Sequence, residues 1–434
     1  MRKRHHHKKK PSFIKKWSAK LHLWFGLAVG IIVFIVSLSG TLYVFKDEIQ
    51  GVLRKDVIYV EAKTITHQPL SIETLKEKVS LEINEKFPIS SVEIPLEKNK
   101  SYEFLYYEKD KKAWNYFDEV KINTVVYVNP YNGEILGVYD EKYDIFPILK
   151  SIHWSLLLKT DWGKYVVGIP VVLFFIMLIT GIILWWPKNK TARKGRFRFS
   201  WKNITTWKRK NYDLHNILGF YASFIALILS LSGIYFSFPW VKNAFHFALS
   251  GSAELPKEKE IKSPDSLLSA KKSVFDLTAK ETKELYVSSS SFRIPLNGKN
   301  KKGKDLKNIP VTVYGEDSKF AIRSQLVFDK YSGKLLMNKP HQQLTTAEKY
   351  ANANYDIHTG SYFGIFGKII WFITGLVCTS LPVTGFLIWW GKRKKERKKE
   401  LENYHEKNHF SSCWFSLCND FCSAQRHITG KRCG

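Results

Sequence analysis

The segment LHLWFGLAVGIIVFIVSLSG, residues 21–40, returns later in the chain as LHNILGFYASFIALILSLSG, residues 214–233. Both segments begin with Leu-His, end with SLSG and keep the same spacing between the histidine and the glycine. Each is close to the roughly 20 apolar residues that a helix needs to cross the hydrocarbon of a bilayer. The repetition therefore predicts two equivalent membrane helices, with His22 and His215 at their beginnings.

A second pair of segments follows the same logic. Ile152-His153 leads to Thr180-Gly181, and Ile357-His358 leads to Thr384-Gly385 with one residue fewer between them. Four apolar runs without Asp, Glu, Lys or Arg result, at 23–45, 165–186, 217–238 and 369–390. The chain is therefore predicted to be an α-helical integral membrane protein with a four-helix transmembrane core built as a tandem repeat.

The net charge of +29 is unevenly distributed. Basic residues cluster beside the apolar runs, in 2–20, 188–210 and 392–399. Basic segments that flank membrane helices face the cytoplasm, where they meet anionic headgroups. We therefore expect membrane lipid rather than nucleic acid as the partner, and both termini in the cytoplasm.

This topology leaves two long segments outside the cytoplasm, each with the pattern of a small α+β domain. In the first, residues 71–86 have helical periodicity, and 91–95, 102–107, 124–128 and 134–139 read as strands around a turn at 129–133. The predicted parts are a basic cytoplasmic tail (1–20), helix 1 (21–45), a first extracytoplasmic insertion (46–150), an interfacial segment with helix 2 (151–186), a basic cytoplasmic loop (187–213), helix 3 (214–238), a second extracytoplasmic insertion (239–356), an interfacial segment with helix 4 (357–390) and a cytoplasmic tail (391–434).

The cysteines give no sign of a disulfide framework. None lies between residues 1 and 377, which fits a bacterial inner-membrane protein. Cys413, Cys418, Cys422 and Cys433 lack the paired C-x2-C spacing of a zinc or iron–sulfur site. A disordered C-terminal tail is the favoured interpretation.

The four histidines of the repeated segments are the candidate cofactor ligands. The topology places His22 and His215 at the cytoplasmic face, and His153 and His358 at the outer face. Two imidazoles alone are few for zinc or non-haem iron, but they satisfy the two axial positions of a b-type haem. The pattern therefore predicts two haems, with His246 as the substitute if an outer ligand is misassigned.

Four glycines lie level with these histidines. Gly181 and Gly385 are expected near the inner pair, and Gly40 and Gly233 near the outer pair. They would either let a flat macrocycle approach the backbone or serve ordinary packing between helices.

Two lysines are also repeated at the outer interface. Lys164 and Lys368 would either neutralise haem propionates or extend to the headgroups, and the second interpretation is favoured.

These features resemble the PepSY-associated transmembrane family over about residues 13–395. The resemblance rests on the LHxxxG openings, on SLSG, on the TG…WW endings at Trp185-Trp186 and Trp389-Trp390, and on VNPYNGEILG at 128–137. That last stretch is similar to the D-P-x-T-G-E turn of PepSY domains, with Asn129 and Asn132 in place of Asp and Thr. The resemblance implies that both insertions are PepSY-like.

The resemblance also implies an activity. One branch of the family consists of iron-regulated membrane proteins that reduce ferric siderophores and carry two haems between their helices. The expected function is electron transfer from a separate cytoplasmic donor, such as a flavoprotein, to a ferric siderophore, an oxidoreductase reaction for which no catalytic acid, base or nucleophile is required. A membrane-anchored PepSY regulatory or binding protein is the alternative, and a transporter is a third possibility that lacks the expected intramembrane carboxylates.

Overall fold

The computed structural model describes residues 12–65, 68–83, 85–187, 195–252, 273–298, 306–315 and 321–429. The side chains of residue 403 and of residues 405–429 are not described. Residues 5–7 of the basic tail and Cys433 therefore lie outside the described part of the chain.

Four helical segments of the described residues are long and apolar enough to cross a membrane. The third consists of two α-helices joined by a π-helical turn, η2. The segments are α1 (Phe13–Tyr43), α7 (Thr160–Trp185), α9 (Trp207–Asp213) with η2 (Leu214–Leu218) and α10 (Gly219–Ser237), and η4 (Ser361–Phe363) with the first part of α14 (Gly364–Thr429).

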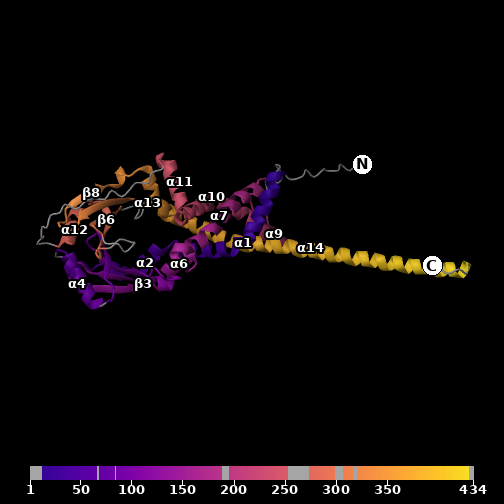
Figure 1. Cartoon of the computed structure of the whole chain (residues 1–434), viewed down its shortest axis with the longest axis horizontal. Coiled ribbons are helices and arrows are strands. Elements are labelled where there is room, and N and C mark those ends of the chain that lie inside the picture. Colours follow the sequence, from indigo (N-terminus) through magenta and orange to yellow (C-terminus); the bar gives the residue numbers. More distant parts are fainter. Residues whose placement is uncertain are drawn as a thin grey trace.

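The first and the last membrane helix are both longer than the sequence predicted. Helix α1 begins at Phe13 rather than Leu21, because the Ser12 side chain accepts a hydrogen bond from the Lys15 N–H and caps the helix there. The tail predicted to be disordered is helical through Thr429. Residues 392–429 contain no glycine or proline, and residues 392–407 are rich in Lys, Arg and Glu, which favour helix. Figure 1 shows α14 running far beyond the other helices, away from the sheet.

The two insertions form one sheet rather than two separate domains. Eight antiparallel strands have the order β4-β3-β2-β1-β5-β6-β7-β8, so the halves meet where β1 pairs with β5. The strands are β1 (Ile89–Pro95), β2 (Tyr102–Lys109), β3 (Val120–Val128), β4 (Ile135–Asp140), β5 (Ser289–Pro295), β6 (Asn308–Gly315), β7 (Arg323–Asp329) and β8 (Leu335–Lys339).

One helix from each half packs on this sheet. The predicted helix is α4 (Ile72–Ile83), and its counterpart is α12 (Val274–Leu285). Leu75 and Val79 of α4 are fully buried in a single apolar core that includes Phe104 and Phe292, one from each half. The two helices also touch, because Asp276 accepts a hydrogen bond from the Ile72 N–H at 2.7 Å.

Short helices connect the sheet to the membrane core. In Figure 1 the sheet and its helices lie at one end of the membrane helices, while α14 leaves from the other end. The remaining short helical elements are α2 (Lys46–Leu53), α3 (Lys55–Ile58), η1 (Ala62–Thr64), α5 (Tyr116–Glu119) between β2 and β3, α6 (Ile145–Ser155), α11 (Pro239–Ser250), η3 (His341–Gln343) and α13 (Thr346–Thr359).

Candidate functional site

The structure brings two histidines together near the sheet. His153 lies on α6 and His358 on α13, and the Nε2 atoms of the two rings are 3.5 Å apart. Their ring centroids are 5.8 Å apart, with an angle of 54° between the ring planes. The histidine that faces His153 is therefore His358 and not His246, which lies on α11.

A second pair lies deeper along the helices. His22 of α1 faces His215 of the π-helical turn η2, with 6.3 Å between ring centroids and an angle of 85° between the planes. The distance between the two pairs can be estimated along helix α1. This helix carries His22 and also Val36, whose carbonyl contacts His153. These residues are 14 positions apart, which corresponds to about 21 Å along a helix.

Each imidazole is held through its Nδ1 atom by an acceptor on a neighbouring helix. His153 donates to the Val36 carbonyl at 2.8 Å, and His22 lies 3.0 Å from the Met177 carbonyl. His22 Nδ1 also lies 3.2 Å from Thr180 Oγ1. The other two histidines contact hydroxyls: His215 Nδ1 is 2.9 Å from Thr384 Oγ1, and His358 Nδ1 is 2.8 Å from Ser232 Oγ.

These contacts fix the tautomer of the rings. A carbonyl oxygen can only accept, so Nδ1 of His153 and His22 carries the proton. The hydroxyls of Thr384 and Ser232 donate to carbonyls of their own helices, at 3.0 Å and 2.7 Å, so each accepts from its histidine. A neutral imidazole protonated at Nδ1 leaves the lone pair of Nε2 free to bind a metal.

The free lone pairs create an electrostatic conflict at the pair near the sheet, His153 and His358. With both Nδ1 atoms protonated, the Nε2 atoms of neutral His153 and His358 face each other as two acceptors. Protonating one ring would relieve this, but removal from water lowers the pKa of both histidines. A metal ion bound by both Nε2 atoms would remove the conflict.

The repeated glycines lie directly against the imidazoles. A Cβ atom built on Gly40 would be 2.6 Å from Cε1 of His153, and one on Gly233 would be 3.4 Å from Cε1 of His358. Gly181 and Gly385 stand in the same relation to His22 and His215, at 3.2 Å each. The glycines therefore make room for the rings, and contact with a macrocycle stays a prediction.

The donor set suits a group that needs only two protein ligands. No cluster of three or more His, Cys, Asp or Glu side chains suitable for a metal ion occurs among residues 12–429 as far as the structure describes them. Paired imidazoles with hydrogen-bonded Nδ1 atoms are ligands that would suit a haem iron.

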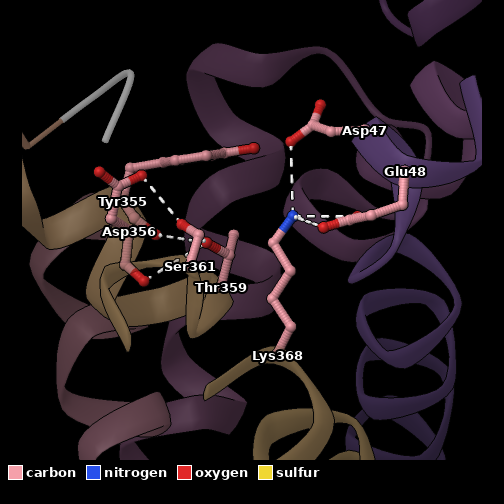
Figure 2. Close-up of polar contacts among 7 residues, drawn as sticks. All are labelled: Asp47, Glu48, Tyr355, Asp356, Thr359, Ser361 and Lys368. Atoms are coloured by element: carbon pink, nitrogen blue, oxygen red, sulfur yellow. Dashed lines mark hydrogen bonds and ion pairs between the residues drawn. The ribbon is translucent and has the colours of Figure 1, made fainter. Parts of the chain in front are cut away.

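The repeated lysines do not behave alike. Lys368 is buried, with 7 % of its surface exposed, and its Nζ lies 2.8 Å from Glu48 and 3.7 Å from Asp47 on α2 (Figure 2). It therefore neither extends to the headgroups nor is left free for a propionate. Lys164 is partly exposed, and its Nζ lies over the Tyr165 ring at 5.0 Å.

Polar contacts also secure the C-terminal end of α13, next to His358. Asp356, two residues before His358, accepts a hydrogen bond from the Ser361 hydroxyl at 3.0 Å (Figure 2). It also accepts one from the Ala321 N–H at 2.6 Å. Because Ala321 lies just before β7, this carboxylate ties the histidine-bearing helix to the sheet.

Two backbone features near the histidines have no counterpart in the sequence pattern. His215 lies in a π-helical turn, a feature that often marks functional sites, while the equivalent His22 lies in a regular α-helix. Leu156 and Leu157 adopt left-handed φ angles of 54° and 62° directly after α6. Such strain costs about 1–3 kcal/mol per residue and concentrates at functional sites.

The comparison with known families agrees with this architecture. Residues 19–392 match the model of the PepSY-associated TM region. The chain belongs to the PepSY-associated transmembrane family. A search of the curated proteins found no match. The family resemblance seen in the sequence is thereby confirmed, and with the four apolar helices it identifies a membrane protein.

Proposed function

We propose that this PepSY-associated transmembrane protein carries electrons across a bacterial inner membrane through two b-type haems. His22 and His215 would hold the inner haem, and His153 and His358 the outer one. When bound, each haem would supply reversible one-electron chemistry at its iron. The observation that carries the proposal is the facing of two Nε2 lone pairs, each on a ring whose Nδ1 proton is already bound.

The protein's own contribution is to hold the ligands. Imidazoles with fixed orientation and tautomer bind a metal more strongly, and their hydrogen-bonded Nδ1 atoms make Nε2 more basic. The two pairs lie at different depths along α1, so a pathway from one side of the membrane to the other needs no moving part. The surrounding apolar side chains limit access of water, which also tunes the potential of a bound cofactor.

The proposed direction of electron transfer is inferred from the distribution of basic residues along the chain. The basic segments 195–210 and 392–399 lie at the end of the helices away from the sheet, so that end is the expected cytoplasmic side. A separate cytoplasmic donor would reduce the inner site. The acceptor beside the sheet would be a ferric siderophore, and its reduction weakens chelation because hard oxygen ligands prefer ferric iron.

The experiment uses the protein reconstituted in lipid vesicles with a reductant enclosed and a ferric chelate outside. Appearance of ferrous iron outside, detected with a ferrous indicator, supports the proposal. The His153→Ala variant should abolish this reaction while the inner haem is still reduced by the enclosed donor. Ferrous iron formation by His153→Ala that equals that of the unmodified protein and exceeds that of protein-free vesicles would overturn it, and a haem-free protein would favour a PepSY regulatory or binding role.

A further inference from the structure

Two buried asparagines occupy the same position relative to the histidines of the second half. Asn211 lies four residues before His215, and Asn354 lies four residues before His358. Only 4 % of the surface of Asn211 is exposed, and none of that of Asn354.

Each asparagine binds the same residue as its histidine does. Asn211 Nδ2 donates to the Thr384 carbonyl at 3.1 Å, while His215 donates to the Thr384 hydroxyl at 2.9 Å. Asn354 Nδ2 donates to the Ser232 carbonyl at 3.2 Å, while His358 donates to the Ser232 hydroxyl at 2.8 Å. Two unrelated helix pairs therefore share one arrangement.

The arrangement is a two-point attachment of one helix to another. Residues four apart lie on the same face of a helix, so an Asn-x-x-x-His segment presents two donors side by side. The facing Thr384 or Ser232 offers its carbonyl and its hydroxyl as the two acceptors. Rotation of the histidine-bearing helix would break the asparagine bond, so this bond fixes the direction in which Nε2 points.

Fold stability alone does not account for Asn354. Its Oδ1 is buried and has no hydrogen-bond partner among the described residues. A buried carbonyl oxygen without a partner is destabilising, so an apolar side chain would serve packing better at this position. The amide is explained by the bond that its Nδ2 makes to Ser232.

The histidines of the first half lack this support. The residue four positions before His22 is Ser18, and the one before His153 is Leu149. Each pair thus contains one histidine that is attached at two points and one that is held through its own Nδ1.

We propose that Asn211 and Asn354 are positioning residues, which orient the second-half ligand of each haem. This inference rests on the proposed function. Loss of such an outer hydrogen bond typically weakens metal binding about 10–100-fold, and the loss is expected only at the pair to which the asparagine belongs.

The test measures haem affinity in proteins that keep one site. Asn211→Leu is made in a His153→Ala background, and Asn354→Leu in a His22→Ala background, so that each change is read at a single haem. Titration with haemin should show binding about 10–100-fold weaker than in the parent variant, and the spectrum should gain a high-spin component from the loosened ligand. Asn216→Leu is the matched control, because Asn216 follows His215 directly but its amide binds the Tyr212 carbonyl of its own helical segment.

Affinity equal to that of Asn216→Leu would overturn the inference. If a leucine variant does not fold, Asn211→Ala or Asn354→Ala replaces it, with the same expected loss. A second readout separates positioning from general stability: thermal unfolding of the haem-free protein should change little, whereas haem affinity falls. If the single-site parents bind no haem at all, the proposed function itself fails.

Discussion

Glu93 of β1 and Arg293 of β5 face each other where the two halves of the sheet meet, and their side chains form an ion pair of 2.5 Å. The strands around them have related sequences, SSVEIPL at 90–96 and SSFRIPL at 290–296. The flanking backbone bonds are also matched, from Leu96 N to Ser290 O at 3.0 Å and from Leu296 N to Ser90 O at 2.9 Å. Glu93 and Arg293 are therefore equivalent positions of the two halves that meet at the centre of the junction. Their opposite charges favour pairing of one half with the other.

Reversing one of these charges is expected to weaken the junction. Glu93→Arg places two guanidinium groups side by side and should destabilise the protein by about 1–3 kcal/mol, at the lower end because Arg293 is partly exposed. Thermal unfolding of the purified protein measures the change.

A second substitution provides the check on this first prediction. Glu93→Arg combined with Arg293→Glu restores the opposite charges and should recover most of the lost stability. Lys280→Glu, in an exposed pair with Glu284, is the control that should have little effect. An equal loss in the double and the single variant would contradict the pairing argument.

The glycines of the outer pair should differ in their tolerance of a methyl group. Gly40→Ala places a Cβ 2.6 Å from the His153 ring and must displace it, whereas Gly233→Ala makes an ordinary contact of 3.4 Å with His358. We expect Gly40→Ala to lose haem at the outer site and Gly233→Ala to keep it. Haem content and the visible spectrum report the outcome, with Gly51→Ala, which meets no atom within 4 Å, as the control.

Lys368 should matter for stability rather than for haem. Lys368→Met leaves Glu48 and Asp47 without their buried cation and should destabilise the protein by about 1–3 kcal/mol. Because the ammonium group is already bound by α2, haem content should not change. Loss of haem in Lys368→Met at unchanged stability would instead indicate a propionate anchor. Lys164→Met, which removes no ion pair in the described structure, should be close to neutral.

Asp329 should make the turn between β7 and β8 sensitive to acid. Burial acts to raise the pKa of its carboxyl group, but hydrogen bonds from Ser332 and Tyr331 outweigh this and lower the pKa. The carboxylate therefore contributes stability above its unfolded pKa of about 3.9, and this contribution is lost as the pH falls through the folded value. Asn129 holds the equivalent turn in the first half and does not titrate.

The Asp329→Asn variant tests this assignment. It should be about 1 kcal/mol less stable than the original protein at neutral pH, because charged hydrogen bonds become neutral ones. That difference in unfolding temperature should shrink as the pH is lowered from about 5 to below 3. A difference that does not depend on pH would contradict the assignment.

The membrane helices were predictable because their signal is local. Runs such as 165–186 have the length and composition of a span, and α7 covers Thr160–Trp185. The turn at Asn129 and the helix in 71–86 likewise depend on neighbouring residues and were found. The grouping of the histidines followed from the direction of each helix, since the sequence repeats place them at matching ends.

What the sequence did not reveal depends on contacts between distant residues. The junction of β1 with β5 joins positions 200 residues apart, and no local turn sequence predicts such a pairing. The attachment of Asn211 to Thr384 was missed for the same reason, although the repeated Asn-x-x-x-His spacing was visible. The length of α14 was underestimated because the polar composition and weak periodicity of the tail were taken as signs of disorder, while residues 392–407 are rich in strong helix formers.

The central claim is that the two histidine pairs hold two haems. The most direct test is a visible absorption spectrum of the detergent-purified protein with pyridine-haemochrome quantitation, repeated for His22→Ala and His358→Ala. The account predicts a Soret band with sharp α and β bands on reduction, about two haems per chain, and about one in each variant. A colourless protein from cells supplied with haem, or a haem content that neither substitution changes, would contradict it.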